Sequence, residues 1–523
     1  MSAATRTVSW WQYLLLIPVI VFFALSCQKS YTGDEGLTVY LASGSYSHLL
    51  SNVGADFHVP GYYTVLWLVS HTFGSSMVIL RLFSLALVIA MLFIAIRHLS
   101  FPAALFLAVS PFTLHLAVEI RMYSMLALLG LMLILAYRRN EKLHSKSSLI
   151  ILIILLSACT WVHYFGWIGT AAVVSLLLLQ RKWKQSAIVL LSVILLFVPW
   201  AGNTISKLDP QHTEIAVDDI GFPDQIPLIH RMAGMPLSVA GTTLRFAGGT
   251  AAFNFDTWGI RFISTRTLAG LFLGILMLTL TIIGFRHNDN ITRSLILWSF
   301  ITLSFFRPSA RHYAIAYSAY MITASLGLPS KNSARKILIL ASAVLMLVMC
   351  FPFAGRTTIP QRCKWDRDFL QVATLAVEES AKYSLPVVLF LDTYSYLGIR
   401  MHIDEIGFPD SMVWYPHRAS FENGRCFFED RAECVSYMQR NTDSLVSVWM
   451  NLDENNRGFI LVANNPDSTS GPVLGTGRNR FIGLGSDIMA DRDLMDALTE
   501  LTTIEQINLS GSSGPLSMFV CSN

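Results

Sequence analysis

The sequence predicts a mainly α-helical membrane bundle followed by a smaller α/β domain. Of the 523 residues, 53% are hydrophobic and only 14% are charged, whereas soluble domains carry roughly 25% charged residues. The mean hydropathy is +0.51. Apolar residues dominate up to about Phe353 and become much rarer after it. We therefore expect a membrane domain over residues 1–353 and a water-soluble domain over residues 354–523.

A helix that crosses a bilayer needs about 20 mostly apolar residues. The sequence contains eleven apolar runs near this length, some of them short: Trp11–Cys27, Ile79–Ile96, Phe101–Leu116, Met122–Tyr137, Ser148–Tyr164, Trp167–Leu179, Ala187–Trp200, Ile263–Phe285, Ser294–Phe306, Tyr313–Leu328 and Ile337–Phe353. They predict a bundle of about eleven transmembrane helices. The net charge of +4 gives no reason to expect a nucleic-acid partner.

The distribution of Lys and Arg predicts the orientation, because short cytoplasmic loops are enriched in these residues. With the N-terminus inside, the predicted cytoplasmic connections carry the basic residues: Arg97, Arg138–Lys146, Arg181–Lys184, Arg286, Arg293, Lys331, Arg335 and Lys336. The first external loop, about residues 28–78, has only Lys29 before Gly61. An odd number of spans then places the C-terminal domain outside, in the periplasm or the extracellular space.

The first apolar run also resembles a signal sequence, but we expect it to be retained as a span. Four cysteines lie in the external tail: Cys363, Cys426, Cys434 and Cys521. They permit disulfides in an oxidising compartment, with Cys426–Cys434 as the preferred pair and four reduced thiols as the alternative.

The tail has the pattern of an α/β domain. Residues 366–383 have helical periodicity, and residues 385–391, 445–450 and 458–463 resemble buried strands. A helix near 488–499 and a last strand, "LSMFV", complete a doubly wound or Rossmann-like sheet. A second external segment, residues 201–262, is too polar to span the membrane and too long for a simple connector.

Ionisable side chains from five separate connections are predicted on the external side. They are Asp34 and Glu35, His58, Glu119 with Arg121, His163 with Tyr164, and Arg307 with Arg311. Each has a plainer interpretation as a solvated loop charge, an interfacial residue or a snorkelling anchor. Charges near a bilayer are costly and usually face a bundle interior or a cavity. Their coincidence on one side favours a functional site.

These residue types suit transfer from a lipid-linked phosphate. A carboxylate can act as a general base on a hydroxyl group, and guanidinium groups bind phosphate oxygens through charge-assisted hydrogen bonds. Nucleotide donors fit poorly because no P-loop or Rossmann fingerprint is present. A transporter, whose charges would gather near the bilayer midplane, and a hydrolase of lipid phosphates remain as alternatives.

Several motifs resemble those of the GT-C membrane glycosyltransferases, in the branch of protein O-mannosyltransferases, aminoarabinose transferases and bacterial lipopolysaccharide glycosyltransferases. The motifs are "YTGDEGLTVYLA", His58-Val59-Pro60, Gly74 with Arg81, "SPF" with "EIRMY" over residues 110–123, "HYFG" over residues 163–166, and Arg307 with Arg311-His312-Tyr313. The match is strong over about the first 165 residues and weaker afterwards. Val59 replaces the first proline of the usual His-Pro-Pro stretch.

This resemblance implies a polyprenyl-phosphate sugar donor and an external hydroxyl acceptor, with transfer by inversion. Asp34 would be the base, and Glu35 would orient the acceptor or a cation. Arg121, Arg311 and Arg307 would bind the donor phosphate, supported by His58, Glu119, His163 and Tyr164. Some relatives involve a divalent metal ion, but no metal ligand set with diagnostic spacing is evident. By analogy the acceptor is a lipopolysaccharide-type glycan or glycolipid, with protein O-glycosylation as the alternative.

Overall fold

The computed structural model describes residues 9–27, 31, 33–55, 58–206, 265–304, 310–350, 369–390, 393–409, 413–414, 459–464, 503–507 and 516–522. The chain divides into two compact units. The helical unit comprises Met1–Lys29 and Ala42–Pro360, and the C-terminal unit comprises Gln361–Asn523 together with Ser30–Leu41. No local sequence pattern indicates that residues 30–41 group with the tail.

A helix coincides with each of the eleven apolar runs. These helices are η1 (Trp10–Leu16) with α1 (Ile17–Ser26), α5 (Met77–His98), α6 (Phe101–Val109) with α7 (Pro111–Leu116), α8 (Tyr123–Leu143), α9 (Lys146–Val162), η2 (Tyr164–Gly166) with α10 (Trp167–Leu179), α11 (Trp183–Ser206), α15 (Thr265–Phe285), α16 (Asn290–Ser304), η4 (Ala310–Tyr313) with α17 (Ala314–Leu326), and α18 (Asn332–Cys350). Met77–His98 and Trp183–Ile205 are long and apolar enough to cross a membrane by length and composition. The number of spans stays a prediction.

Three further helices lie between the first and second apolar runs: α2 (Gly33–Leu41), which belongs to the C-terminal unit, and α3 (Tyr46–Ala55) and α4 (Pro60–Phe73) of the helical unit. Pro60 stands at the first position of α4, where its missing N–H and fixed φ suit a helix start. The helix ends at Gly74, whose φ of 105° is readily adopted only by glycine. The segment after His58 is therefore a helix with a defined start and end.

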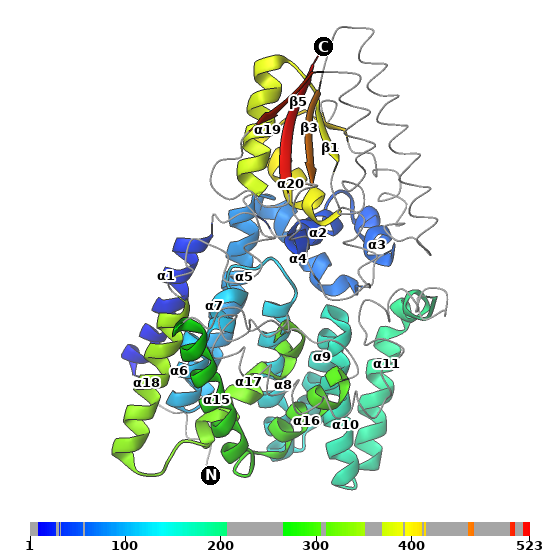
Figure 1. The fold of residues 1–523 in the computed structure, drawn as a ribbon. Helices are drawn as coiled ribbons and strands as arrows, with labels where there is room; N and C mark the ends of the chain where they lie inside the picture. The colour runs from blue at the N-terminus through cyan, green and yellow to red at the C-terminus, as the bar shows by residue number, and fades with distance from the viewer. Residues whose placement is uncertain are drawn as a thin grey trace, which may run out of the picture. The chain divides into compact units, whose positions relative to one another are not determined.

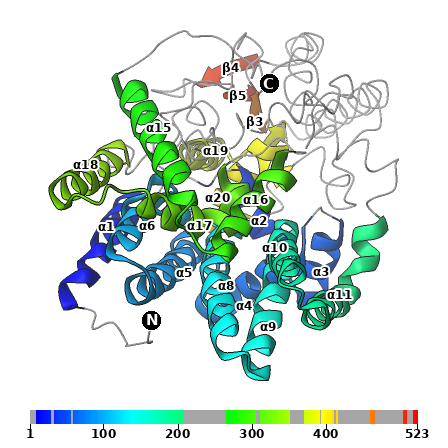
Figure 2. The same ribbon diagram turned by 90° about the horizontal axis from the view of Figure 1, so that it is seen from below.

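Helix α17 forms the centre of the helical unit. Every residue from Ala314 to Ser325 is buried, as expected for a helix that is surrounded by others. It packs against α6, α8, α15 and α16, and Figure 2 shows α17 among these neighbours. A Cβ atom on Gly130 of α8 would lie 2.2 Å from the backbone oxygen of Ile315. Glycine at residue 130 thus allows α8 and α17 to approach closely.

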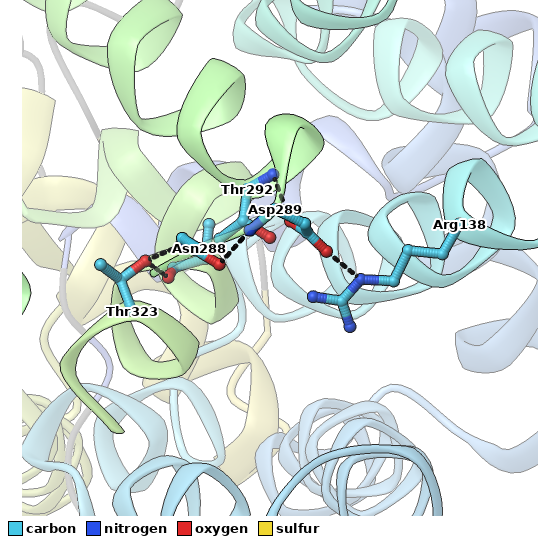
Figure 3. A network of polar contacts seen from close by, with 6 residues as sticks. Arg138, Asn288, Asp289, Thr292 and Thr323 are labelled. Atoms are coloured by element: carbon cyan, nitrogen blue, oxygen red, sulfur yellow. Dashed lines mark hydrogen bonds and ion pairs between the residues drawn. The ribbon is translucent and has the colours of Figure 1, made fainter. Parts of the chain in front are cut away.

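One end of α8 and α17 is fixed by a set of polar contacts shown in Figure 3. Arg138, near the C-terminal end of α8, pairs with Asp289, and Asn288 donates a hydrogen bond to Thr323 of α17. The Asp289 carboxylate also accepts a hydrogen bond from the Thr292 N–H at 3.0 Å, which caps the start of α16. These contacts hold three helices together.

The C-terminal unit contains a mixed sheet. Its strands are β1 (Val387–Phe390), β2 (Val413–Trp414), β3 (Phe459–Asn464), β4 (Thr503–Ile507) and β5 (Leu516–Ser522), in the order β2-β1-β3-β5-β4. β1 is parallel to β2 and β3, whereas β5 is antiparallel to both β3 and β4. The doubly wound prediction is therefore wrong for this edge. Residues 508–515 are too few for the crossover that a parallel β4–β5 pair would need.

Helices α19 (Phe369–Tyr383) and α20 (Thr393–Ile406) pack together in this unit. Their apolar residues join those of β1 in one core, with Val387, Leu389, Ile399 and Ile403 fully buried. Gly398 permits the contact, because a Cβ atom there would lie 2.2 Å from the Phe369 ring. Helix α2 (Gly33–Leu41) packs against α20 (Figure 1).

Several predictions fall outside the described residues. They concern most of the loop 201–262, the strand at 445–450, the helix at 488–499 and the pair Cys426–Cys434.

Candidate active site

Glu119 lies in the turn between α7 and α8, at the centre of a cluster of ionisable side chains. Helix α7 begins at Pro111, after Ser110, whose hydroxyl caps it. It ends at Leu116, and α8 begins only at Tyr123, so Glu119 lies in the non-helical segment between them. Ser84 of α5 donates a hydrogen bond to the Glu119 carbonyl at 2.8 Å, and the Arg121 N–H donates to the same oxygen at 3.0 Å. Glu119 is only 2% exposed. The turn therefore holds a carboxylate inside the helical unit.

Three basic side chains surround this carboxylate. His115 Nε2 lies 3.1 Å from Glu119 Oε2, and Arg311 Nη1 lies 3.8 Å from Oε1. Burial by itself would raise the pKa of Glu119, but the neighbouring His115, Arg311 and Arg121 outweigh it and lower the pKa to about 2. Glu119 is thus ionised at neutral pH and is poorly suited to accept a proton there. Its chemistry is that of an anchor for the basic groups.

The Tyr123 ring brings the two arginines together. The Cζ atoms of Arg121 and Arg311 lie 5.8 and 5.6 Å from the centre of this ring, within the range of a cation–π contact. Arg121 precedes the N-terminus of α8, and Arg311 precedes that of α17. Helix N-termini carry partial positive charge and exposed N–H groups, which favour bound anions. Two guanidinium groups and two helix N-termini make this region suitable for a phosphate.

Aromatic and imidazole rings extend the cluster. The His163 ring lies 5.6 Å from that of Tyr123 and 4.8 Å from that of Phe165, and the His312 ring lies 5.2 Å from Phe165. His163 Nδ1 accepts a hydrogen bond from the Phe165 N–H at 3.0 Å. In neutral His163 the proton is therefore on Nε2, which leaves that atom as a donor.

The remaining predicted residues of the helical unit lie at or beyond the edge of the cluster. His58 precedes α4, its ring lies 5.4 Å from that of Tyr63, and it is near enough to His163 for their charges to interact. The Tyr164 hydroxyl lies 3.3 Å from Thr204 Oγ1, so it contacts α11. Arg307 lies outside the described residues. The structure therefore brings Arg121, Arg311 and His163 together around Tyr123, with Glu119 beside Arg311.

Asp34 and Glu35 belong to the C-terminal unit. Both lie in the first turn of α2, where a negative charge is stabilised by the helix dipole. The Thr38 hydroxyl donates a hydrogen bond to the Asp34 carbonyl at 2.9 Å, which reinforces this turn. Glu35 is fully buried, whereas Asp34 is only half-buried.

Sequence reasoning missed three members of the cluster: His115, Tyr123 and His312. His115 stands four residues before Glu119, and this spacing was the signal that could have revealed it, because residues four apart are neighbours on a helix. The contact forms even though α7 ends at Leu116. Tyr123 and His312 lie within the quoted motifs, beside the arginines. Within the described residues, no group of three or more His, Cys, Asp or Glu is arranged to hold a metal ion.

Comparison with solved structures identifies the fold. The crystal structure of ArnT from Cupriavidus metallidurans in the apo state superimposes with a TM-score of 0.55 and 12% sequence identity, covering 99% of this chain and 98% of that one. ArnT is an aminoarabinose transferase and a GT-C enzyme. The chain therefore shares the fold of ArnT.

A second ArnT structure, bound to undecaprenyl phosphate, agrees. It superimposes with a TM-score of 0.50 and 13% identity, with the same coverage of both chains. No protein-family model and no curated protein sequence matches this chain. The resemblance to GT-C enzymes predicted from the sequence motifs is confirmed at the level of the fold.

Proposed function

We propose that the protein is an integral membrane glycosyltransferase that uses a polyprenyl-phosphate sugar donor. The observation that carries the proposal is the cluster around Glu119, where Arg121 and Arg311 flank one tyrosine ring on a GT-C fold. The fold is shared with ArnT, of which one structure holds undecaprenyl phosphate. A lipid phosphate is an anion of the kind that paired guanidinium groups bind well.

The proposed reaction uses the roles that the sequence resemblance implies for Asp34, Glu35 and the arginines. The acceptor hydroxyl loses its proton to the Asp34 carboxylate, while its oxygen attacks the anomeric carbon of the donor sugar. A new glycosidic bond forms, the bond from the anomeric carbon to the phosphate oxygen breaks, and the configuration inverts. The polyprenyl phosphate leaves with the electron pair. Glu35 orients the acceptor.

The cluster supplies stabilisation where negative charge develops. As the bond to phosphate breaks, charge accumulates on the leaving oxygen, and Arg121 and Arg311 stabilise it in a preorganised position. Glu119 keeps this position fixed because it is buried and contacts Arg311. His58, His163 and Tyr164 support the site, and Arg307 adds a further cation to the phosphate contacts.

The setting of the reaction is the cell membrane. The N-terminus is cytoplasmic, and the C-terminal unit is outside with the acceptor. We propose a glycan or glycolipid of the cell envelope as the acceptor, as in lipopolysaccharide modification. The alternative acceptor is a protein hydroxyl, and protein O-glycosylation would then be the activity.

The test compares purified full-length wild type with Asp34→Asn, in detergent, using radiolabelled undecaprenyl-phosphate sugars and glycolipid acceptors. Removal of a general base slows transfer by about 10²–10⁴-fold. Glu35→Gln is the matched control for an adjacent carboxylate, and we expect a smaller loss of activity with a raised KM for the acceptor. Undiminished transfer by Asp34→Asn would exclude Asp34 as the base. Absence of transfer by wild type from any donor would overturn the proposed function.

A further inference from the structure

The segment that carries Asp34 and Glu35 is held by the C-terminal domain. Residues 30–41 form one compact unit with residues 361–523, although in the sequence they interrupt the helical unit. The Tyr31 N–H donates a hydrogen bond to His402 Nε2 at 3.1 Å, across 371 residues of sequence. The Tyr31 hydroxyl donates to Glu405 Oε1 at 3.2 Å.

These three side chains form a closed set of contacts, here called the Tyr31 latch (Tyr31, His402 and Glu405). The Tyr31 and His402 rings lie 4.9 Å apart, and His402 Nδ1 lies 3.5 Å from Glu405 Oε2. Tyr31 is 2% exposed and His402 is fully buried. Because Nε2 accepts the Tyr31 N–H, the proton of neutral His402 is on Nδ1, facing Glu405.

Helix α20 is itself rigidly placed. Its residues Ile399 and Ile403 are buried in the core with α19 and β1, while His402 and Glu405, three residues apart, meet Tyr31. Residues three or four apart are neighbours on a helix surface, so the latch residues of α20 lie directly beside its core residues. The core of the C-terminal domain thus determines where Tyr31 lies.

Tyr31 in turn fixes the start of α2. Asp34 and Glu35 lie in the first turn of α2, which begins two residues after Tyr31, and α2 itself packs against α20, so the latch and this packing together hold the acidic pair. Catalytic groups depend on such support, because a displacement of about 1 Å can cost roughly 10²-fold in rate. A loop that carries a base needs an anchor of this kind.

We propose that the C-terminal domain positions the carboxylates of α2 through the Tyr31 latch, with His402 and Glu405 as positioning residues. This inference rests on the proposed function for its catalytic consequence. Its structural part, that the latch orders α2, stands separately. The domain is then a working part of the transferase, in addition to any role in selecting the acceptor.

The test uses the full-length protein with His402→Ala and Tyr31→Phe. His402→Ala removes the acceptor of the Tyr31 N–H, and Tyr31→Phe removes only the bond to Glu405. We expect kcat for sugar transfer to fall by about 10–100-fold in His402→Ala and by a smaller factor in Tyr31→Phe, with KM for the donor unchanged. His402→Gln, whose amide oxygen can accept the Tyr31 N–H, should recover most of the lost rate.

Two controls separate positioning from general destabilisation. Ile403→Val loosens the core beside His402 without touching Tyr31, so it should lower Tm but keep kcat. Hydrogen–deuterium exchange of residues 33–41 provides a readout that does not require activity, and it should become faster in His402→Ala but not in Ile403→Val. Exchange and kcat that are unchanged in His402→Ala would overturn the inference. Absence of transfer by wild type would instead overturn the proposed function, while the exchange result would still decide whether the latch orders α2.

Discussion

The two ends of helices α8 and α17 carry ionisable groups of contrasting arrangement. At the C-terminal ends, Arg138 and Asp289 form a one-to-one pair, and Asp289 also caps α16. Their side chains are 31% and 34% exposed. At the N-terminal ends, two arginines and a histidine surround Glu119, which is buried. The same two helices therefore have an exposed ion pair near one end and a cluster of basic groups beside a buried carboxylate at the other.

A supporting ion pair and a candidate site differ in the burial of their charges and in the groups around them. A half-exposed pair that also satisfies a helix cap contributes modestly to stability. A buried carboxylate held among several basic groups, at two helix N-termini, has no comparable capping role. Its arrangement fits the phosphate-binding role that we propose for Arg121 and Arg311. Substitutions can change the Arg138–Asp289 pair and the Glu119 cluster separately, so the difference between them can be tested.

The largest expected effect comes from disturbing the helix pair that the two ends share. In Gly130→Ala the new Cβ atom would lie 2.2 Å from the Ile315 backbone oxygen, so α17 must shift relative to α8. We expect a loss of about 1–3 kcal/mol in the free energy of unfolding, as for an overpacked core. Because the shift also moves Arg311, the rate of sugar transfer should fall by at least about tenfold.

Gly202→Ala in α11 is the matched control for this change, because a Cβ atom there would meet no other atom within 4 Å. Its thermal stability in detergent and its transfer rate should equal or exceed those of wild type. Equal rates in Gly130→Ala and wild type would show that the N-terminal cluster does not depend on this close approach.

A smaller effect, confined to stability, is expected at the C-terminal ends. Asp289→Ala removes the partner of Arg138 and the cap of α16, so the free energy of unfolding should fall by about 1–2 kcal/mol. The transfer rate at a temperature below Tm should stay within about twofold of wild type. A loss of activity larger than the loss of stability explains would show that sugar transfer also depends on the Arg138–Asp289 pair. The two ends of the helices would then not differ in function.

The smallest expected effect is a change in thermal stability at acidic pH. The pKa of Glu119 is lowered from 4.5 to about 2 in the folded protein, so its stabilising contribution is present above about pH 4.5. That contribution is lost as the pH falls towards 2. The difference in Tm between wild type and Glu119→Gln should therefore be present above about pH 4.5 and shrink as the pH falls towards 2. A difference that grows on acidification would contradict the lowered pKa.

The sequence was sufficient to predict most of the helical unit. Long uninterrupted apolar runs have no other stable arrangement than a buried or membrane helix, and a helix coincides with each of them. Glu119, Arg121 and Arg311 were expected on one side because the basic residues set the orientation of the spans, and the alternation of spans then puts the connections that carry these three residues outside. The structure places Arg121 and Arg311 around one ring, with Glu119 beside Arg311.

The remaining features depend on contacts between distant parts of the chain. The contact of Tyr31 with His402 joins residues 371 positions apart, and no local pattern indicates it. The antiparallel direction of β5 follows from its pairing with β3 and β4, whereas an apolar strand looks the same in either direction. His115 was missed because one histidine on an apolar helix resembles an ordinary buried residue.

The central claim is that Arg121 and Arg311 bind the phosphate of a polyprenyl lipid. The most direct measurement is the affinity of undecaprenyl phosphate for the full-length wild type, Arg311→Ala and Arg138→Ala in detergent. A charge-assisted hydrogen bond contributes about 1.5–3 kcal/mol, so Arg311→Ala should bind about 10–100-fold more weakly, while Arg138→Ala binds like wild type. Equal affinity in all three proteins would contradict the claim.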